Sequence, residues 1–101
     1  MDANPVRHVM LVGVEVTDDD SYTRYRAAMT PILAGFGGAF GCDFEVATVL
    51  LGDRRINRVF TISFPDRAAR ERFFADADYQ SARERFYEPA VAHAEVLAEF
   101  G

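Results

Sequence analysis

The chain has 101 residues and a mass of 11.3 kDa, which is enough for one domain and too little for two. Hydrophobic residues make up 50% of it and charged residues 27%, a composition that excludes a mainly disordered chain. The formal net charge of −5 argues against a protein that binds nucleic acid or an anionic membrane surface.

No apolar run approaches the roughly 20 residues of a membrane span, and the N-terminus shows no signal-like apolar region. The single cysteine, Cys42, has no partner for an internal disulfide. We therefore expect a cytoplasmic protein. Met1 to Pro5 is interpreted as a short lead-in before the first structural element.

The first third of the chain predicts a strand followed by a helix. Arg7 to Val16 (RHVMLVGVEV) is apolar at both odd and even positions, which is typical of a strand covered on both faces. Thr17 to Asp20 predicts a helix start, with the threonine as N-cap and three carboxylates at the positive end of the helix dipole. Pro31 predicts that this helix ends near Thr30, or in an irregular turn by Ala34.

The middle of the chain predicts a β-hairpin. Gly37 and Gly38 follow a helix rather than open one, so we expect them to serve backbone geometry and not phosphate binding. Phe40 to Leu51 predicts a second strand, and Gly52 to Arg55 predicts an exposed turn. Asn57 to Phe64 (NRVFTISF), rich in β-branched and aromatic residues, predicts the strand that pairs back.

The last third predicts a second helix and a closing strand. The helix opens at Pro65, is interrupted around Asp76 to Asp78 and ends at Pro89, and Ala94 to Phe100 predicts the strand. The order is then βαββαβ, a ferredoxin-like α+β plan for one domain over residues 1–101, with an antiparallel sheet and both helices on one face. The second apolar face of the first strand needs a cover, and the economical cover is a second copy packed sheet against sheet.

Several motifs occur in a familiar order along the chain. They are Tyr25, Met29 to Leu33, Phe36 to Gly38, Val49 to Gly52, Arg58 to Pro65, Ala69, Phe74 and Tyr79 with Gln80. In this order the chain resembles the bacterial domain-of-unknown-function family DUF1330, a member of the dimeric α+β barrel superfamily, from about Val9 to Phe100. The resemblance implies a homodimer. The wider superfamily includes cofactor-free monooxygenases, polyketide cyclases, lactone isomerases and haem-dependent chlorite-degrading enzymes, among which fold does not choose.

The chain departs from the usual pattern of that family at two places. Ser63 stands where an acidic residue usually precedes the Phe-Pro step, and Phe86 stands where an arginine is usual. Arg83 and Arg85 lie near the second place but out of register. Both departures fall where the mouth of a pocket would be.

Metal and thiol chemistry have little support in the sequence. His8 and His93 are expected at opposite ends of the sheet, and the chain has no HxH or HxxxH pair and no second cysteine. We therefore expect no metal and no cofactor. Cys42 is interpreted as a small buried apolar residue, and Asp18 to Asp20 as charge compensation at a helix start.

The remaining candidates are polar residues placed among apolar ones. Glu15, Glu45 and Arg58 lie in strands, where they either line a wet cavity or make ion pairs at strand ends. We expect a pocket between the helices and the sheet with His8, Tyr25 and Arg58 as its polar, catalytic groups. Antiparallel pairing places His8 nearer Phe64 than Arg58, so two separate clusters are expected. His8 has the alternative of an ordinary, partly exposed strand-end residue.

Three further tyrosines are candidates for contacts with a ligand: Tyr22, Tyr79 and Tyr87. Two functions remain open. The first is a metal-free enzyme that acts on a small apolar or aromatic molecule by proton transfer or oxygenation, as a monooxygenase, cyclase or isomerase does. The second is a non-catalytic homodimeric module that binds a ligand or serves another enzyme. A cavity with convergent polar groups favours the first, and a filled core favours the second.

Overall fold

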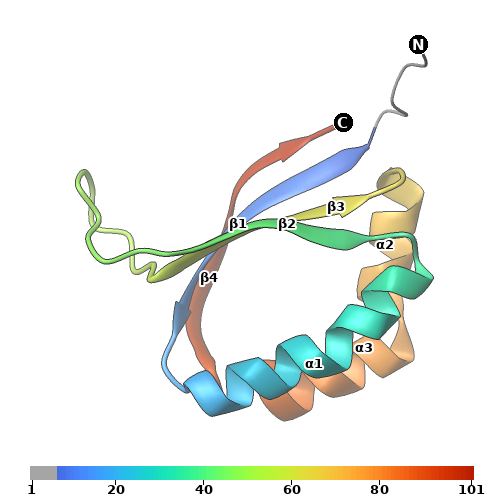
Figure 1. Ribbon diagram of the computed structural model, residues 1–101, viewed down its shortest axis with the longest axis horizontal. Helices are drawn as coiled ribbons and strands as arrows, with labels where there is room; N and C mark the ends of the chain where they lie inside the picture. Colours follow the sequence, from blue (N-terminus) through green and yellow to red (C-terminus); the bar gives the residue numbers. More distant parts are fainter. Residues whose placement is uncertain (1–6) are drawn as a thin grey trace.

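The computed structural model describes residues 7–101 and has the predicted ferredoxin-like α+β order (Figure 1). The expected lead-in, Met1 to Pro5, lies outside the described residues. The elements are β1 (His8–Val16), α1 (Asp19–Gly35), β2 (Ala39–Glu45), β3 (Arg58–Phe64), α2 (Arg67–Ala75), α3 (Ala77–Ala82), the π-helical turn η1 (Arg83–Tyr87) and β4 (Val91–Phe100). The strands form one antiparallel sheet in the order β2-β3-β1-β4, and the helices lie together on one of its faces (Figure 1).

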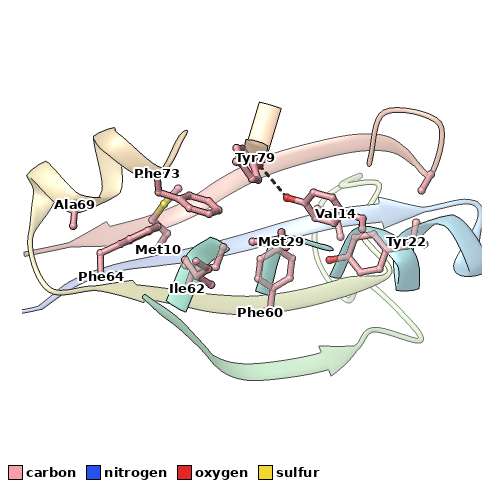
Figure 2. Packing of buried hydrophobic residues seen from close by; sticks show 14 residues of the cluster. Met10, Val14, Tyr22, Met29, Phe60, Ile62, Phe64, Ala69, Phe73 and Tyr79 are labelled. Carbon is pink, nitrogen blue, oxygen red and sulfur yellow. Dashed lines mark hydrogen bonds between the residues drawn. The ribbon is translucent and has the colours of Figure 1, made fainter. Parts of the chain in front are cut away.

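The core lies between the sheet and the helices. Alternate residues of β1 and β3, among them Met10, Phe60 and Ile62, point toward the helices and are buried. Met29 of α1 and Phe73 of α2 meet them from the other side (Figure 2). This packing fixes which face of the sheet carries any site enclosed by the helices.

The register of β1 and β3 confirms the predicted separation of His8 from Arg58. His8 is opposite Phe64, and Arg58 is opposite Val14, so the two side chains start from opposite ends of the sheet. The predicted interruption of the second helix is also confirmed. Asp76 separates α2 from α3, and its carboxylate accepts a hydrogen bond from the Tyr79 amide at 2.9 Å.

Of the two ends expected for the first helix, the one near Thr30 is wrong, because α1 continues as a regular helix past Pro31 to Gly35, one residue beyond the alternative end by Ala34. Met29 before the proline and Leu33 after it are both buried in the core. Burying two such side chains contributes about 1.5–3 kcal/mol each, which offsets the roughly 3 kcal/mol cost of an interior proline. The N-cap also differs: it is Asp18, whose carboxylate accepts from the Ser21 amide, while the Thr17 hydroxyl donates to the Ala90 carbonyl.

The predicted second strand is too long. Pairing of β2 with β3 ends at Glu45 opposite Arg58, and the chain from Val46 onward forms a loop. Asn57 holds the far end of this loop. Its side-chain oxygen accepts a hydrogen bond from the Val16 amide, and its side-chain nitrogen donates one to the Val16 carbonyl, both at 2.8 Å. Leu50 and Leu51, expected in a strand, are 93% and 89% exposed. Within the described part of the chain, no strand pairs with these two leucines.

Cys42 is exposed, which contradicts the expectation of a buried residue. It lies on β2, the edge strand, where the register with β3 shifts between Phe40 and Asp43. An irregularity of this kind turns an edge residue away from the regular alternation, which explains why a small apolar side chain is left outside the core.

Gly37 and Gly38 serve backbone geometry, as predicted. They close a Schellman motif at the end of α1: the Gly38 amide donates to the Leu33 carbonyl, and the Gly37 amide donates to the Ala34 carbonyl, both at 2.9 Å. Gly37 has a φ of +76°, a conformation that favours glycine.

The face of the sheet opposite the helices carries no helix among residues 7–101 (Figure 1). Val9 and Leu11 of β1 point to this side, since they alternate with the core residues of the same strand. Phe44, opposite Val59, and Phe100, opposite Val9, share the face and are 58% and 59% exposed. We refer to these residues together as the open face.

Candidate functional site

A cavity of about 310 Å³ lies between the sheet and the helices α1, α3 and η1. Its volume is at the lower end of the range of about 300–1,000 Å³ that is usual for ligand sites. The strands supply an apolar floor of Met10, Val12, Phe60 and Ile62. The helical side supplies most of its polar groups, so the cavity has one apolar and one polar wall.

Three tyrosines, Tyr25, Tyr79 and Tyr87, form the helical wall, and we call them the tyrosine cluster. The hydroxyls of Tyr25 and Tyr79 are 2.9 Å apart and share a hydrogen bond, drawn as the dashed line in Figure 2. The rings of Tyr25 and Tyr87 pack with centroids 4.8 Å apart. A pair of hydroxyls uses one of its two hydrogens internally, so the other remains to donate to a bound molecule.

Each member of the tyrosine cluster comes from a different helical element. Tyr25 lies about two turns into α1 and faces the sheet. Tyr79 sits in the first turn of α3, where the Asp76 cap fixes its backbone. Tyr87 ends η1, whose π-type hydrogen bond runs from the Glu88 amide to the Arg83 carbonyl at 3.0 Å. Short π-helical segments within helices often occur at functional sites.

The tyrosine hydroxyls of the cluster are neutral hydrogen-bond donors. Burial, reinforced by Tyr79, raises the pKa of Tyr25 far above its ordinary value of 10. Burial also raises the pKa of Tyr79, although the hydrogen bond with Tyr25 and the charge of Arg83 oppose that rise. Burial raises the pKa of Tyr87 to about 12. Groups with such pKa values donate hydrogen bonds at neutral pH and do not act as bases there.

Arg83 is the cation that the described residues contribute to this cavity. Its guanidinium carbon lies 5.2 Å from the centre of the Tyr87 ring, in the range of a cation–π contact. Gln80 on α3 and Glu95 on β4 also line the cavity. The Glu95 carboxylate is already bound to Arg54 and, at 3.2 Å, to His93.

Of the six residues expected to form a site, the structure brings together the three of the tyrosine cluster. Tyr22 is buried beside Tyr25, with ring centroids 5.8 Å apart, but it does not line the cavity. Its hydroxyl accepts a hydrogen bond from Nε of Arg26 at 3.1 Å. This tyrosine is therefore held within the core.

Arg58 lies away from the cavity, at the start of β3. Its guanidinium donates to both carboxylate oxygens of Asp43 at 2.9 and 2.8 Å, and Arg26 reaches the same carboxylate. The hydrogen bond from Arg58 is the main cause of the lowered pKa of Asp43. This geometry matches the alternative of an ion pair at a strand end. Arg58 also lines a separate polar cavity of about 540 Å³, together with Glu45 and Asn57.

His8 also lies outside the cavity, and it is only 3% exposed, which corrects the expectation of a partly exposed residue. Its ring contacts the Glu99 carboxylate, and Arg70 of α2 reaches the same carboxylate at 2.9 Å. The contact with His8 is the main cause of the lowered pKa of Glu99. The last strand covers His8 because β4 pairs along β1 to Phe100, beside the start of β1.

The model of the family described as a domain of unknown function (DUF1330) matches residues 9–99. The chain belongs to the DUF1330 family. No functionally curated protein gives a significant match to the sequence. None of the helices in residues 7–101 is long and apolar enough to cross a membrane.

Solved structures share the fold of this DUF1330 chain at low sequence identity. RPA0582, a protein of unknown function from Rhodopseudomonas palustris, is 19% identical with a TM-score of 0.79, covering 96% of this chain and 82% of that one. A dimeric ferredoxin-like protein of unknown function from Jannaschia sp. CCS1 is 19% identical with a TM-score of 0.62, covering 95% and 99%. A candidate antibiotic biosynthesis monooxygenase from Nitrosomonas europaea is 13% identical with a TM-score of 0.62, covering 100% and 94%.

Sequence reasoning did not assign Arg83 to the site of this DUF1330 chain. Arg83 lies out of register with the arginine usual in the family, so the resemblance does not point to it. The signal that identifies it is its spacing from Tyr79 and Tyr87, four residues on either side, which places all three on one helical face. That spacing is visible without the structure.

Proposed function

We propose that the protein is a metal-free enzyme of monooxygenase, cyclase or isomerase type that acts on a small apolar or aromatic molecule bound in the cavity. The observation that supports this most is the tyrosine cluster above an apolar floor. The floor takes the hydrocarbon part of a ligand, and the hydroxyls orient its oxygen atoms.

The hydroxyls have a chemical role that follows from their protonation. A neutral phenol that donates a hydrogen bond stabilises negative charge as it develops on a carbonyl or phenol oxygen of the substrate. The free hydrogen of the Tyr25–Tyr79 pair and the hydroxyl of Tyr87 are the donors for this purpose. The structural likeness to the Nitrosomonas europaea protein supports oxygenation as one of the three reaction types.

A second candidate function is a non-catalytic ligand-binding or accessory module. It is favoured by the residues of 7–101 that line the cavity, because they include no histidine and the Glu95 carboxylate is bound to Arg54 and His93 on the open-face side of β4. A proton-transfer enzyme needs a base near its substrate. In this cavity, the substrate itself or the solvent would have to act as that base.

The test measures binding and turnover of 2-naphthol by the wild-type protein and by two variants. The fluorescence of 2-naphthol reports binding, and product analysis and oxygen uptake report turnover. Tyr79→Phe removes one donor and is expected to weaken binding by about twofold to tenfold. Tyr22→Phe is the matched control, because it removes a buried hydroxyl outside the cavity. If 2-naphthol and a panel of related phenols and ketones bind and are recovered chemically unchanged, the module is favoured. Absence of binding to every aromatic probe would contradict the enzyme and the ligand-binding form of the module.

We further propose that the protein works as a homodimer in which the open faces of two copies pack together. The support is the exposure of Phe44 and Phe100 on a sheet face that no helix within residues 7–101 covers, since soluble monomers rarely leave large apolar side chains uncovered together. The dimeric Jannaschia protein has the same fold and supports this arrangement. In such a dimer the tyrosine cavities lie on the far side of each sheet from the interface.

A further inference from the structure

The charged residues around the cavity differ in how free they are to bind a ligand. Among residues 7–101, Arg83 and Glu95 are the charged residues that line it, and the Glu95 side chain starts from the opposite side of β4, because Glu95 pairs with Gly13 and alternates with the helix-facing Ala94 and Val96. Glu95 is bonded to Arg54 and His93, whereas the contact of Arg83 with a carboxylate, that of Glu88, is long at 3.4 Å. The Arg83 side chain is 43% exposed, so it can reach a ligand without first breaking a strong ion pair.

The position of Arg83 relative to the tyrosines restricts what it can bind. Its guanidinium sits against the Tyr87 ring at 5.2 Å, on the same cavity wall as the Tyr79 hydroxyl. The π-helical turn that begins at Arg83 carries this cation and Tyr87 at its two ends. A ligand lying on the apolar floor would therefore meet a cation and neutral hydroxyl donors at one side only.

Resting on the function proposed above, we propose that the cavity selects small aromatic carboxylates and that Arg83 is the residue that binds the carboxylate. A planar guanidinium matches a carboxylate with two parallel hydrogen bonds, and the neutral hydroxyls of the cluster donate to the same group or to a neighbouring oxygen. The formal net charge of −5 disfavours multiply charged ligands such as phosphate esters.

The experiment compares 2-naphthoate with 2-naphthol, which share one ring system and differ in charge. Wild-type protein is expected to bind 2-naphthoate more tightly. Arg83→Gln is expected to weaken binding of 2-naphthoate by about tenfold or more and to leave 2-naphthol within about twofold, because charge-assisted hydrogen bonds are the stronger kind. Arg85→Gln is the matched control, since Arg85 is exposed, stacks on Phe86 and does not line the cavity.

Each other outcome overturns the inference in a distinguishable way. Equal weakening of both ligands by Arg83→Gln would assign this residue to the cavity wall and remove its role in selection. Binding of 2-naphthol without 2-naphthoate would overturn the choice of ligand class while leaving the proposed function standing. Absence of binding to either probe would remove the proposed function and this inference together. Unchanged melting temperatures of the variants exclude unfolding as the cause.

Discussion

Leu11→Arg is expected to convert the protein from a dimer to a monomer. Leu11 lies on β1, an inner strand of the sheet, and points to the open face. In a dimer that packs open face against open face, the substitution would bury a charge without a partner in both copies, at a cost of several kcal/mol per charge. Light scattering at micromolar protein should give twice the 11.3 kDa chain mass for the wild type and a single chain mass for the variant.

The control for this experiment is Ala27→Arg, which adds the same charge at an exposed position of α1, on the helical side. It should remain dimeric. A wild-type mass of one chain, or a Leu11→Arg variant that stays dimeric, would contradict the proposed interface. A circular dichroism spectrum unchanged from the wild type shows that the core between sheet and helices survives the substitution.

Stability is expected to fall steeply as the pH rises above about 10. All four tyrosines of the chain have raised pKa values in the folded protein, mainly because of burial: Tyr22, Tyr25, Tyr79 and Tyr87. The unfolded chain titrates near the ordinary value of about 10, so between that pH and the raised values the folded state holds more protons. Rising pH therefore favours unfolding in this window, and the stabilisation is fully present below it.

The measurement is a series of denaturant unfolding curves across the alkaline range, together with tyrosinate absorbance of the folded protein. The folded protein should show little tyrosinate at a pH near 10, where the denaturant-unfolded chain is about half ionised. Tyr87 should be half ionised only near pH 12 if the fold persists. Ionisation of one tyrosine at its ordinary pKa in the folded protein would show that its ring is not buried as described.

The order of the elements could be predicted from local sequence patterns, which do not depend on tertiary contacts. Strong alternation in β3, helical spacing in α1 and the Asp76 break each reflect local chemistry that the fold then uses. The opposite placement of His8 and Arg58 also follows, because antiparallel pairing alone dictates it. These features were predictable.

The errors arise where tertiary packing or the absence of a partner overrides a local signal. Burial of Met29 and Leu33 carries α1 past Pro31. Leu50 and Leu51 have strand-like neighbours in sequence, but residues 7–101 offer no strand to pair with them, so they lie in a loop. A single sequence shows the propensity of each segment and not the contacts that decide it.

The candidate site was predictable in part. Tyr25, Tyr79 and Tyr87 are candidates because of their hydroxyls, and helix packing brings them to one cavity. Arg58 is a candidate because a polar group in an apolar strand needs a partner, and His8 because a histidine is suited to act as a general base. Both have carboxylate partners in the structure: Glu99 for His8 and Asp43 for Arg58. The rule that selects buried polar residues does not tell a ligand site from an ion pair.

The most direct test of the cavity is a methyl NMR titration of protein labelled at its three methionines. Met10 lines the cavity, while Met29 is buried in the core and does not line it. Addition of 2-naphthoate should shift the Met10 methyl resonance saturably and leave that of Met29 nearly unchanged, with Met10→Leu assigning the signal. A Met10 resonance that stays fixed up to millimolar ligand, or that moves no more than Met29, would contradict the claim that the tyrosine cavity is the ligand site.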